Sequence, residues 1–156
     1  MADDKAGAPA EEKAVLVVPA ETAELPRVNQ FLHAGLDRHQ CLPHVRGQLD
    51  IAVEELFVNA CKYAYEDAEA DVARTVLVTQ AFGAEPPSVT VEIIDSGTPF
   101  DPLAKPDAAT ADAFESVADI PIGGLGILMA KQSVDEMRYE RVDERNVVTL
   151  FKLLAE

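Results

Sequence analysis

Two pairs of short apolar segments, each pair joined by a turn, place the strongest constraint on the fold. Segments 75–82 and 88–95 flank the turn 83–87, and segments 137–142 and 146–153 flank a polar turn at 143–145. Strands joined by such short connections pair antiparallel. The chain is therefore expected to build an antiparallel sheet from these two hairpins.

Three helices and one further strand complete the expected architecture. Apolar residues recur at helical spacing over 22–40, 44–65 and 127–135, and a short β-branched run at 14–18 precedes Pro19. The resulting order of elements is β-α-α-β-β-loop-α-β-β. It predicts an α+β fold, a two-layer sandwich with the helices on one face of a mixed, mostly antiparallel sheet.

The domain organisation follows from length and local composition. The chain has 156 residues, a length that suits one domain. Residues 1–13 have Met1 as their one large apolar side chain and are expected to form a disordered tail, leaving 14–156 as a single domain. Within it, residues 96–122 are punctuated by prolines, and a loop of that length is typically functional or disordered.

The charge balance argues against two classes of partner. There are 28 acidic and 13 basic residues, giving a net charge of −15. Such a polyanion repels nucleic acid backbones and anionic lipid surfaces, so we expect neither nucleic acid nor membrane as partner.

No stretch approaches the roughly 20 apolar residues of a membrane span, and the N-terminus lacks the apolar core of a signal peptide. A cytoplasmic location is expected, with Cys41 and Cys61 reduced.

Polar residues interrupt the apolar pattern of the long helix. On a helical projection Glu55, Asn59 and Lys62 cluster beside the apolar stripe rather than opposite it. Asparagine is a mediocre helix former, so its place at mid-helix asks for a reason. A solvated helix face and a functional cluster remain equally open at this point.

Two strand residues are also candidates. Asp95 continues the apolar face of Val89, Val91 and Ile93, and either starts a turn with Ser96-Gly97 or is a buried acceptor for a ligand N–H, with Gly97 letting a flat group approach. Thr149 is a hydroxyl within an apolar row of the last strand, where an ordinary strand threonine is the simpler interpretation.

A glycine-rich segment precedes the third helix. Gly123-Gly124-Leu125-Gly126 offers free N–H groups and a helix N-terminus, which together favour an anion. The segment is neither a dinucleotide fingerprint nor a Walker loop, so alone it indicates little.

Taken in order and spacing, these segments resemble the GHKL ATPase family and its Bergerat nucleotide-binding fold. Residues 55–59 (Glu-Leu-Phe-Val-Asn) match the asparagine helix, 95–102 the Asp-x-Gly motif and 124–127 the glycine motif. Within that family the short chain is similar to the RsbW-like anti-sigma-factor serine/threonine kinases. The resemblance covers about residues 14–154.

The resemblance implies a role for each matched residue. Asp95, supported by Thr149, would accept the adenine amino proton of ATP; Asn59 would hold Mg²⁺; Glu55 would be the general base. Residues at about 98–122 would form a mobile lid. The expected nucleotide-binding residues are Asn59, Lys62, Asp95, Gly97, Phe100, Gly123, Gly124, Leu125, Gly126, Ile127 and Thr149.

The implied activity is transfer of the ATP γ-phosphate to a serine of a STAS-domain anti-anti-sigma protein, with alternate binding of a sigma factor and formation of a homodimer.

Two departures from the family pattern keep an alternative open. The better-known kinases carry an arginine before the glycine motif, where this chain has Ile120-Pro121-Ile122-Gly123, and His-Gly where it has Tyr63-Ala64. A non-catalytic ATP-binding switch, and an acidic interaction domain without nucleotide, are the competing hypotheses.

Overall fold

The computed structural model describes residues 13–69, 71–104 and 124–154. The expected disordered tail, apart from Lys13, lies outside these ranges, as do Gly123 and most of the expected lid.

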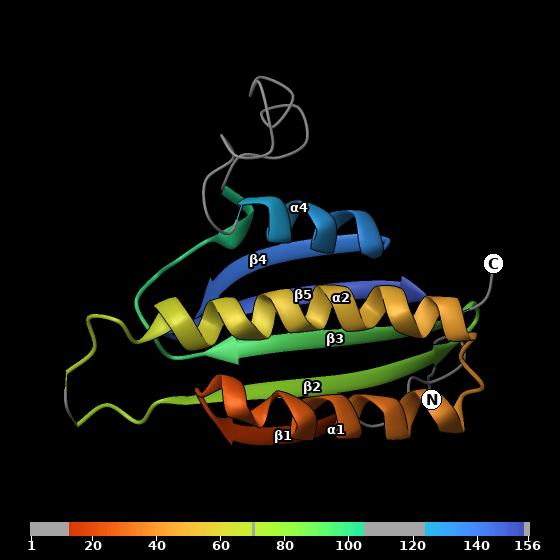
Figure 1. Ribbon diagram of the computed structural model, residues 1–156, viewed down its shortest axis with the longest axis horizontal. Helices are drawn as coiled ribbons and strands as arrows, with labels where there is room; N and C mark the ends of the chain where they lie inside the picture. The colour runs from red at the N-terminus through yellow and green to blue at the C-terminus, as the bar shows by residue number, and fades with distance from the viewer. Residues whose placement is uncertain (1–12, 70, 105–123, 155–156) are drawn as a thin grey trace, which may run out of the picture.

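Within these described ranges, five strands form one sheet with the order β1-β2-β3-β5-β4 (Figure 1). Each neighbouring pair is antiparallel, so the sheet is not mixed as expected but antiparallel throughout. The strands are β1 Ala14–Pro19, β2 Thr75–Ala84, β3 Pro87–Asp95, β4 Glu136–Val142 and β5 Arg145–Leu153. Both predicted hairpins are confirmed, each with a tighter turn than expected.

The helices lie on one face of this sheet (Figure 1), which confirms the predicted α+β architecture. They are α1 Leu25–Arg38, α2 Pro43–Asn59 and α4 Gly124–Ser133, with shorter turns at Thr22–Glu24, Ala60–Ala64 and Pro102–Ala104. Helix α2 packs between α1 and α4 and is the central element of the helical layer.

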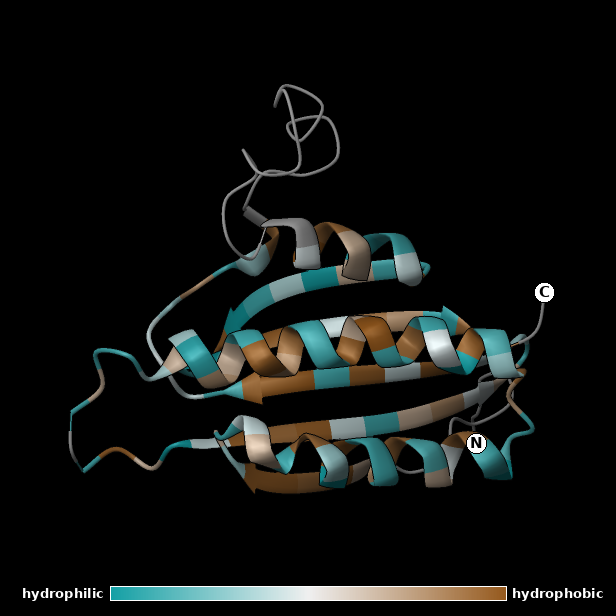
Figure 2. Ribbon diagram, viewed as in Figure 1, coloured by the Kyte–Doolittle hydropathy of each residue, from teal (hydrophilic) through white to brown (hydrophobic). Residues whose placement is uncertain are grey.

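The core lies between the two layers. Apolar and polar positions are interspersed along α2 (Figure 2), and its Leu49, Val53 and Phe57 are fully buried in the core. Alternate residues of the strands meet them, among them Val91 and Leu150, which are cross-strand neighbours. Burial of this apolar surface is the dominant stabilising contribution, and it fixes the C-terminal end of α2 over the end of β3 and the start of β5.

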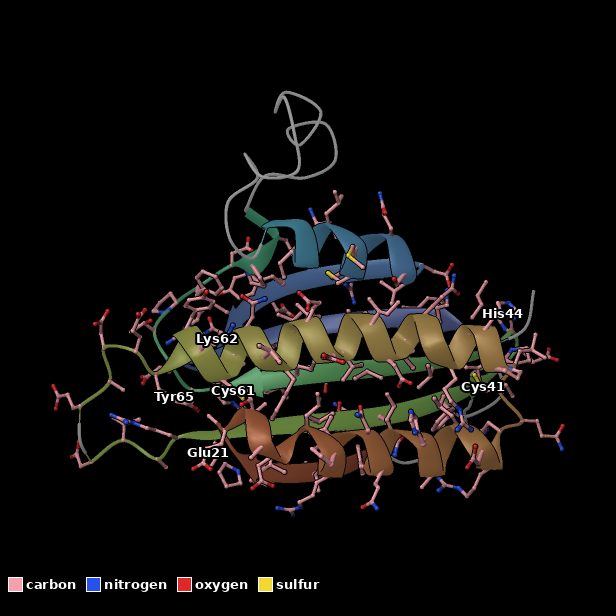
Figure 3. The ribbon with its side chains drawn as sticks, viewed as in Figure 1. Glu21, Cys41, His44, Cys61, Lys62 and Tyr65 are labelled. Atoms are coloured by element: carbon pink, nitrogen blue, oxygen red, sulfur yellow. The ribbon has the colours of Figure 1, made fainter. Side chains whose placement is uncertain are left out.

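A π-helical turn follows Asn59 directly and spans Ala60–Ala64. It inserts an extra residue into the helical repeat, which rotates every later side chain relative to an ideal α-helix. Lys62, predicted to share a face with Glu55 and Asn59, is exposed on this turn at the end of α2 (Figure 3). π-turns are frequent at functional sites, and this one begins immediately after a predicted site residue.

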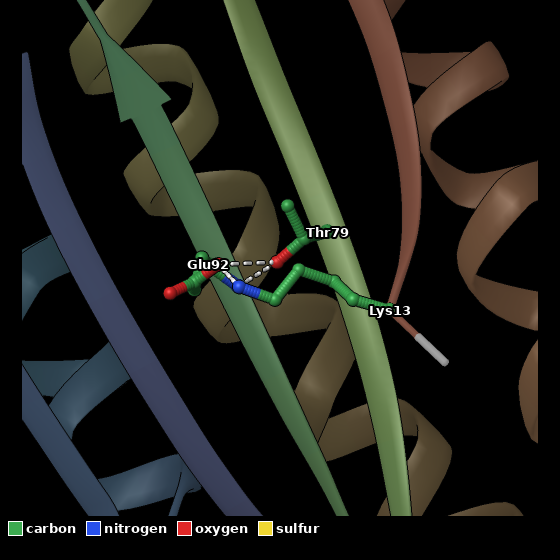
Figure 4. A network of polar contacts seen from close by, with 3 residues as sticks. All are labelled: Lys13, Thr79 and Glu92. Carbon is green, nitrogen blue, oxygen red and sulfur yellow. Dashed lines mark hydrogen bonds and ion pairs between the residues drawn. The ribbon is translucent and has the colours of Figure 1, made fainter. Parts of the chain in front are cut away.

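No helix from the described part of the chain covers the other face of the sheet. Val15 and Val17 of β1 are about half exposed there, at 51% and 53%. Toward the centre, Glu92 accepts hydrogen bonds from Lys13 Nζ and Thr79 Oγ1, each at 2.9 Å (Figure 4). The register therefore separates a helix-covered face from an outer face with its own polar network.

Cys41 and Cys61 are free thiols near opposite ends of α2 (Figure 3). Burial, and secondarily the charge of Glu21, raises the pKa of Cys61 to about 11, so this thiol is protonated at neutral pH.

Among the described residues, no helix combines the length and apolar character required to cross a bilayer.

Candidate nucleotide site

Asp95 ends β3 with its side chain on the helix-covered face, as predicted. The residue is 7% exposed, and its Oδ1 accepts hydrogen bonds from Gly97 N at 2.9 Å and Asn146 Nδ2 at 2.8 Å. Burial raises the pKa of the carboxyl, while Asn146, the Gly97 N–H and the nearby Arg141 oppose that rise. Oδ2 has no hydrogen bond within the described part of the chain and is available to a ligand donor.

Thr149, predicted to support Asp95, does not lie beside it. The register pairs Thr149 with Glu92 and pairs Asp95 with Asn146. Because side chains alternate along a strand, Thr149 lies on the outer face of the sheet. The prediction is wrong, and Asn146 occupies the position that had been assigned to Thr149.

Gly97 is required by the protein backbone itself. A Cβ atom at this position would collide with the carbonyl group of Ala64, to which Thr98 N donates a hydrogen bond at 3.0 Å. The flat group that approaches Gly97 is therefore the end of the π-turn, where the sequence had predicted a ligand. This contact ties the Asp-x-Gly turn to the helix that carries Asn59.

We expect Gly97→Ala to lower the free energy of unfolding by about 3 kcal/mol, because backbone at both sides of the collision must shift. Gly47→Ala is the matched control: Gly47 lies within α2 with no atom near its added Cβ, so alanine should stabilise by about 1 kcal/mol. Denaturant unfolding of both variants measures the difference. Equal effects of the two substitutions would contradict the close contact at Gly97.

A pocket lies where α2, β3 and β5 converge. Asp95, Asn59 and Phe100 are brought together there, as the sequence predicted for a single site. The full lining is Leu56, Asn59, Ala60, Ile93, Asp95, Phe100, Pro102, Asn146 and Val148. It encloses about 20 Å³, room for about one water molecule, so the lining must move apart before a purine can enter.

Asn59 has the chemistry of a metal ligand. Its Nδ2 donates to the Glu55 carbonyl at 3.0 Å, which leaves Oδ1 buried without a hydrogen-bond partner among the described residues. An unsatisfied buried oxygen is costly and requires an explanation. Oxygen ligands suit Mg²⁺, which typically takes one or two protein groups and completes its coordination with phosphates and water. Asn59 therefore fits the proposed metal.

Glu55 lies one turn before Asn59 on α2 but does not line the pocket. A Cβ on Gly126 would collide with Glu55 Oε1, so this carboxylate packs against the first turn of α4. Glu55 also lines an open groove of about 190 Å³ between α2 and α4, together with Ile51, Glu54 and Met129. The glycine motif thus supplies space for Glu55 at a helix N-terminus, where negative charge is favoured.

The glycine motif differs in detail from its prediction. Helix α4 begins at Gly124, so Gly124 and Leu125 belong to its first turn rather than to the preceding loop. Ile127 is 1% exposed and packs in the core, away from the pocket. Lys62 and Gly97 do not line the pocket either, and Gly123 falls outside the described residues.

Comparison with known proteins agrees with this geometry. Residues 18–152 match the family model HATPase_c_2, described as the histidine kinase-like ATPase domain. The chain belongs to this family. Membership implies ATP binding, and the converging pocket of Asn59 and Asp95 lies within the matched region. Family membership alone does not show Mg²⁺ binding. The structural argument for Mg²⁺ is the buried Asn59 Oδ1, which has no hydrogen-bond partner among the described residues.

The solved structures add a fold relationship to this ATPase domain. The crystal structure of the RsbU and RsbW domains of Rv1364c from Mycobacterium tuberculosis aligns with a TM-score of 0.61 at 18% identity. The alignment covers 92% of this chain and 33% of that one, so the chain spans about a third of the length of the protein it matches. The GHKL resemblance is confirmed at the level of family by the ATPase domain model, and this structural alignment confirms the fold. A comparison with curated proteins found no significant match.

Proposed function

We propose that this ATPase domain is a protein serine/threonine kinase that transfers the γ-phosphate of ATP to a serine of a STAS-domain anti-anti-sigma protein, and so regulates a sigma factor by partner switching. One observation carries the proposal: Glu55 lies one turn before Asn59 on α2, with its carboxylate against the first turn of α4 and open to a groove. A carboxylate between a nucleotide pocket and an external groove is suitably placed to meet an incoming hydroxyl group.

In the proposed mechanism the adenine enters the pocket and its amino group donates to Asp95 Oδ2. The phosphates extend toward the amides of the first turn of α4. Asn59 would hold Mg²⁺, which when bound supplies charge neutralisation for the phosphates. Phe100 and Pro102 close over the base and exclude water from the pocket.

Glu55 accepts the proton of the partner's serine hydroxyl while the serine oxygen bonds to the γ-phosphorus. The bond from the γ-phosphorus to the bridging oxygen breaks, and ADP leaves with that oxygen. The proton is then released from Glu55 to solvent. The products are phosphoserine and ADP, so no further co-reactant is needed.

The acceptor serine would approach along the groove between α2 and α4. Ile51 and Met129 present apolar surface there, at 39% and 45% exposure, and Glu54 adds a second carboxylate. An acceptor segment with an apolar side chain and a basic neighbour would complement this groove. The sigma factor and a second copy of the chain are proposed partners of the same assembly.

The test is to incubate the protein with Mg-ATP and with STAS proteins whose genes lie near its own gene, and then to search for phosphoserine by mass spectrometry. Phosphorylation of one serine on one STAS protein, dependent on Mg-ATP, is the expected result. Bound ATP with no phosphoserine on any of them would refute the kinase proposal and leave the ATPase domain as a binding module.

A binding-only switch is the second candidate, and a specific observation favours it. Among the described residues, neither the pocket nor the groove is lined by lysine or arginine, and the stretch before Gly124 in the sequence has no arginine. Phosphoryl transfer usually employs such a cation. A switch would form nucleotide-dependent partner complexes without consuming ATP.

A further inference from the structure

We propose that Asn146 is the positioning residue that fixes Asp95 for recognition of the purine amino group. This inference rests on the proposed binding of ATP in the pocket, and it concerns a residue outside every motif that the sequence indicated. Asn146 lies at the start of β5 and is 3% exposed.

The amide of Asn146 is fully occupied by the protein. Its Nδ2 donates to Asp95 Oδ1 and to the Thr98 carbonyl, each at 2.8 Å. Its Oδ1 accepts from Phe100 N at 3.2 Å and Tyr139 Oη at 2.6 Å, and from Arg141 at 3.2 Å. Both amide hydrogens are used, so Asn146 acts on a ligand through Asp95 rather than by direct contact.

These partners also fix the orientation of the amide. The Nδ2 group meets two acceptors, a carboxylate and a carbonyl, while Oδ1 meets three donors. Rotating the amide by half a turn would oppose donors to donors on one side and acceptors to acceptors on the other. The network therefore admits one rotamer, and that rotamer holds Asp95 Oδ1 and leaves Oδ2 for the ligand.

The same amide connects Asp95 to the segment that closes the pocket. Thr98 and Phe100 are hydrogen-bonded to Asn146, and Arg141 Nη1 donates to the Gly97 carbonyl at 2.8 Å. The turn after β3 is thus held to the hairpin of β4 and β5. Phe100 and Asp95 both line the pocket, and Asn146 is hydrogen-bonded to both.

Charge supports the assignment. Arg141 on β4 is the charged group that acts on Asp95 from the neighbouring strands, and the Asn146 hydrogen bond opposes the effect of burial on the carboxyl. Tyr139, also on β4, acts through Asn146. Loss of the amide donor would favour the protonated carboxyl, which is a poor acceptor for a purine amino group.

The experiment compares ATP with its 6-deamino analogue, purine riboside triphosphate, by calorimetric titration across a range of pH. The wild-type chain should bind ATP about 10- to 100-fold more tightly, the contribution of a hydrogen bond to a charged group. Asn146→Asp keeps the acceptor oxygen but sets a carboxyl against Asp95. It should lose this preference, and the acid limb of its ATP binding should move to higher pH.

Two further variants separate positioning from folding. Asn146→Ala removes the donor without adding charge and should also lose the preference for ATP while retaining affinity for the deamino analogue. Thr149→Val lies on the same strand but on the outer face of the sheet. It should leave the affinity for both ligands unchanged. An equal loss for both ligands in the Asn146 variants, or an unchanged preference, would overturn the inference. Absence of ATP binding by the wild-type chain would instead refute the proposed function.

Discussion

Asp95→Asn will weaken ATP binding about 100-fold without unfolding the domain. The asparagine Oδ1 can still accept from Gly97 N and Asn146 Nδ2, so the turn after β3 keeps its hydrogen bonds. Its amide nitrogen then replaces Oδ2 and presents a donor to the adenine amino group. A charge-assisted hydrogen bond contributes roughly 1.5–3 kcal/mol, and an opposed pair of donors adds a desolvation cost.

Titration calorimetry measures this loss, and the stability of the variant is the internal control. Because burial raises the pKa of Asp95, the carboxyl contributes stability when protonated, below its ordinary pKa, and that contribution is lost as pH rises through the raised value. At neutral pH the asparagine variant should be at least as stable as the wild type. A variant that is destabilised and binds ATP normally would contradict the assignment of Asp95.

Glu55→Gln will lower phosphoryl transfer about 1,000-fold while leaving ATP affinity within about twofold, a rate loss within the range of general-base catalysis. Glutamine fills the same space against Gly126, so α2 and α4 keep their packing. It cannot accept the serine proton at neutral pH. Single-turnover transfer to the STAS partner measures the rate, and ATP titration measures the affinity.

Glu54→Gln is the matched control, because Glu54 lines the same groove but is exposed and does not pack against Gly126. At a saturating concentration of the STAS partner it should retain the transfer rate to within a few-fold, because Glu54 is proposed to contact the acceptor segment and not the reacting hydroxyl. If Glu55→Gln transfers phosphate as fast as the wild type, the general base lies elsewhere. If neither protein transfers phosphate but both form ATP-dependent complexes, the binding-only switch is correct.

The sequence predicted the parts of the site that depend on local periodicity. Periodicity placed Asn59 beside the apolar stripe of α2 and Asp95 on the apolar face of β3. The family resemblance then assigned both residues to one site, and both line the pocket. The hairpins were predictable for the same reason, since alternation and short turns are local signals.

The errors arose where tertiary pairing or helix irregularity decides the outcome. Alternation assigns Thr149 to one of two faces, but both faces of β5 carry apolar residues, Val147 and Phe151 on one and Val148 and Leu150 on the other. Choosing between them requires the register with β3. Lys62 was placed by an ideal helical repeat that the π-turn interrupts, and no propensity signals such a turn.

Asn146 was missed because its significance is not local. In the sequence it is a polar residue beside a turn, a position where asparagine is common. The antiparallel register of β3 and β5 sets it opposite Asp95, at the end of a strand 51 residues earlier in the chain. In an antiparallel pair the last residue of β3 meets the first residues of β5, so Asn146 becomes a candidate once these two strands are known to be neighbours.

A crystal structure with Mg²⁺ and a non-hydrolysable ATP analogue tests the central claim most directly. The predicted result is an adenine amino group hydrogen-bonded to Asp95 Oδ2, Mg²⁺ on Asn59 Oδ1, and Phe100 and Pro102 displaced from their present positions in the pocket. The triphosphate should reach the first turn of α4 beside Glu55. A nucleotide bound elsewhere, or a base in the pocket without contact to Asp95, would contradict the account.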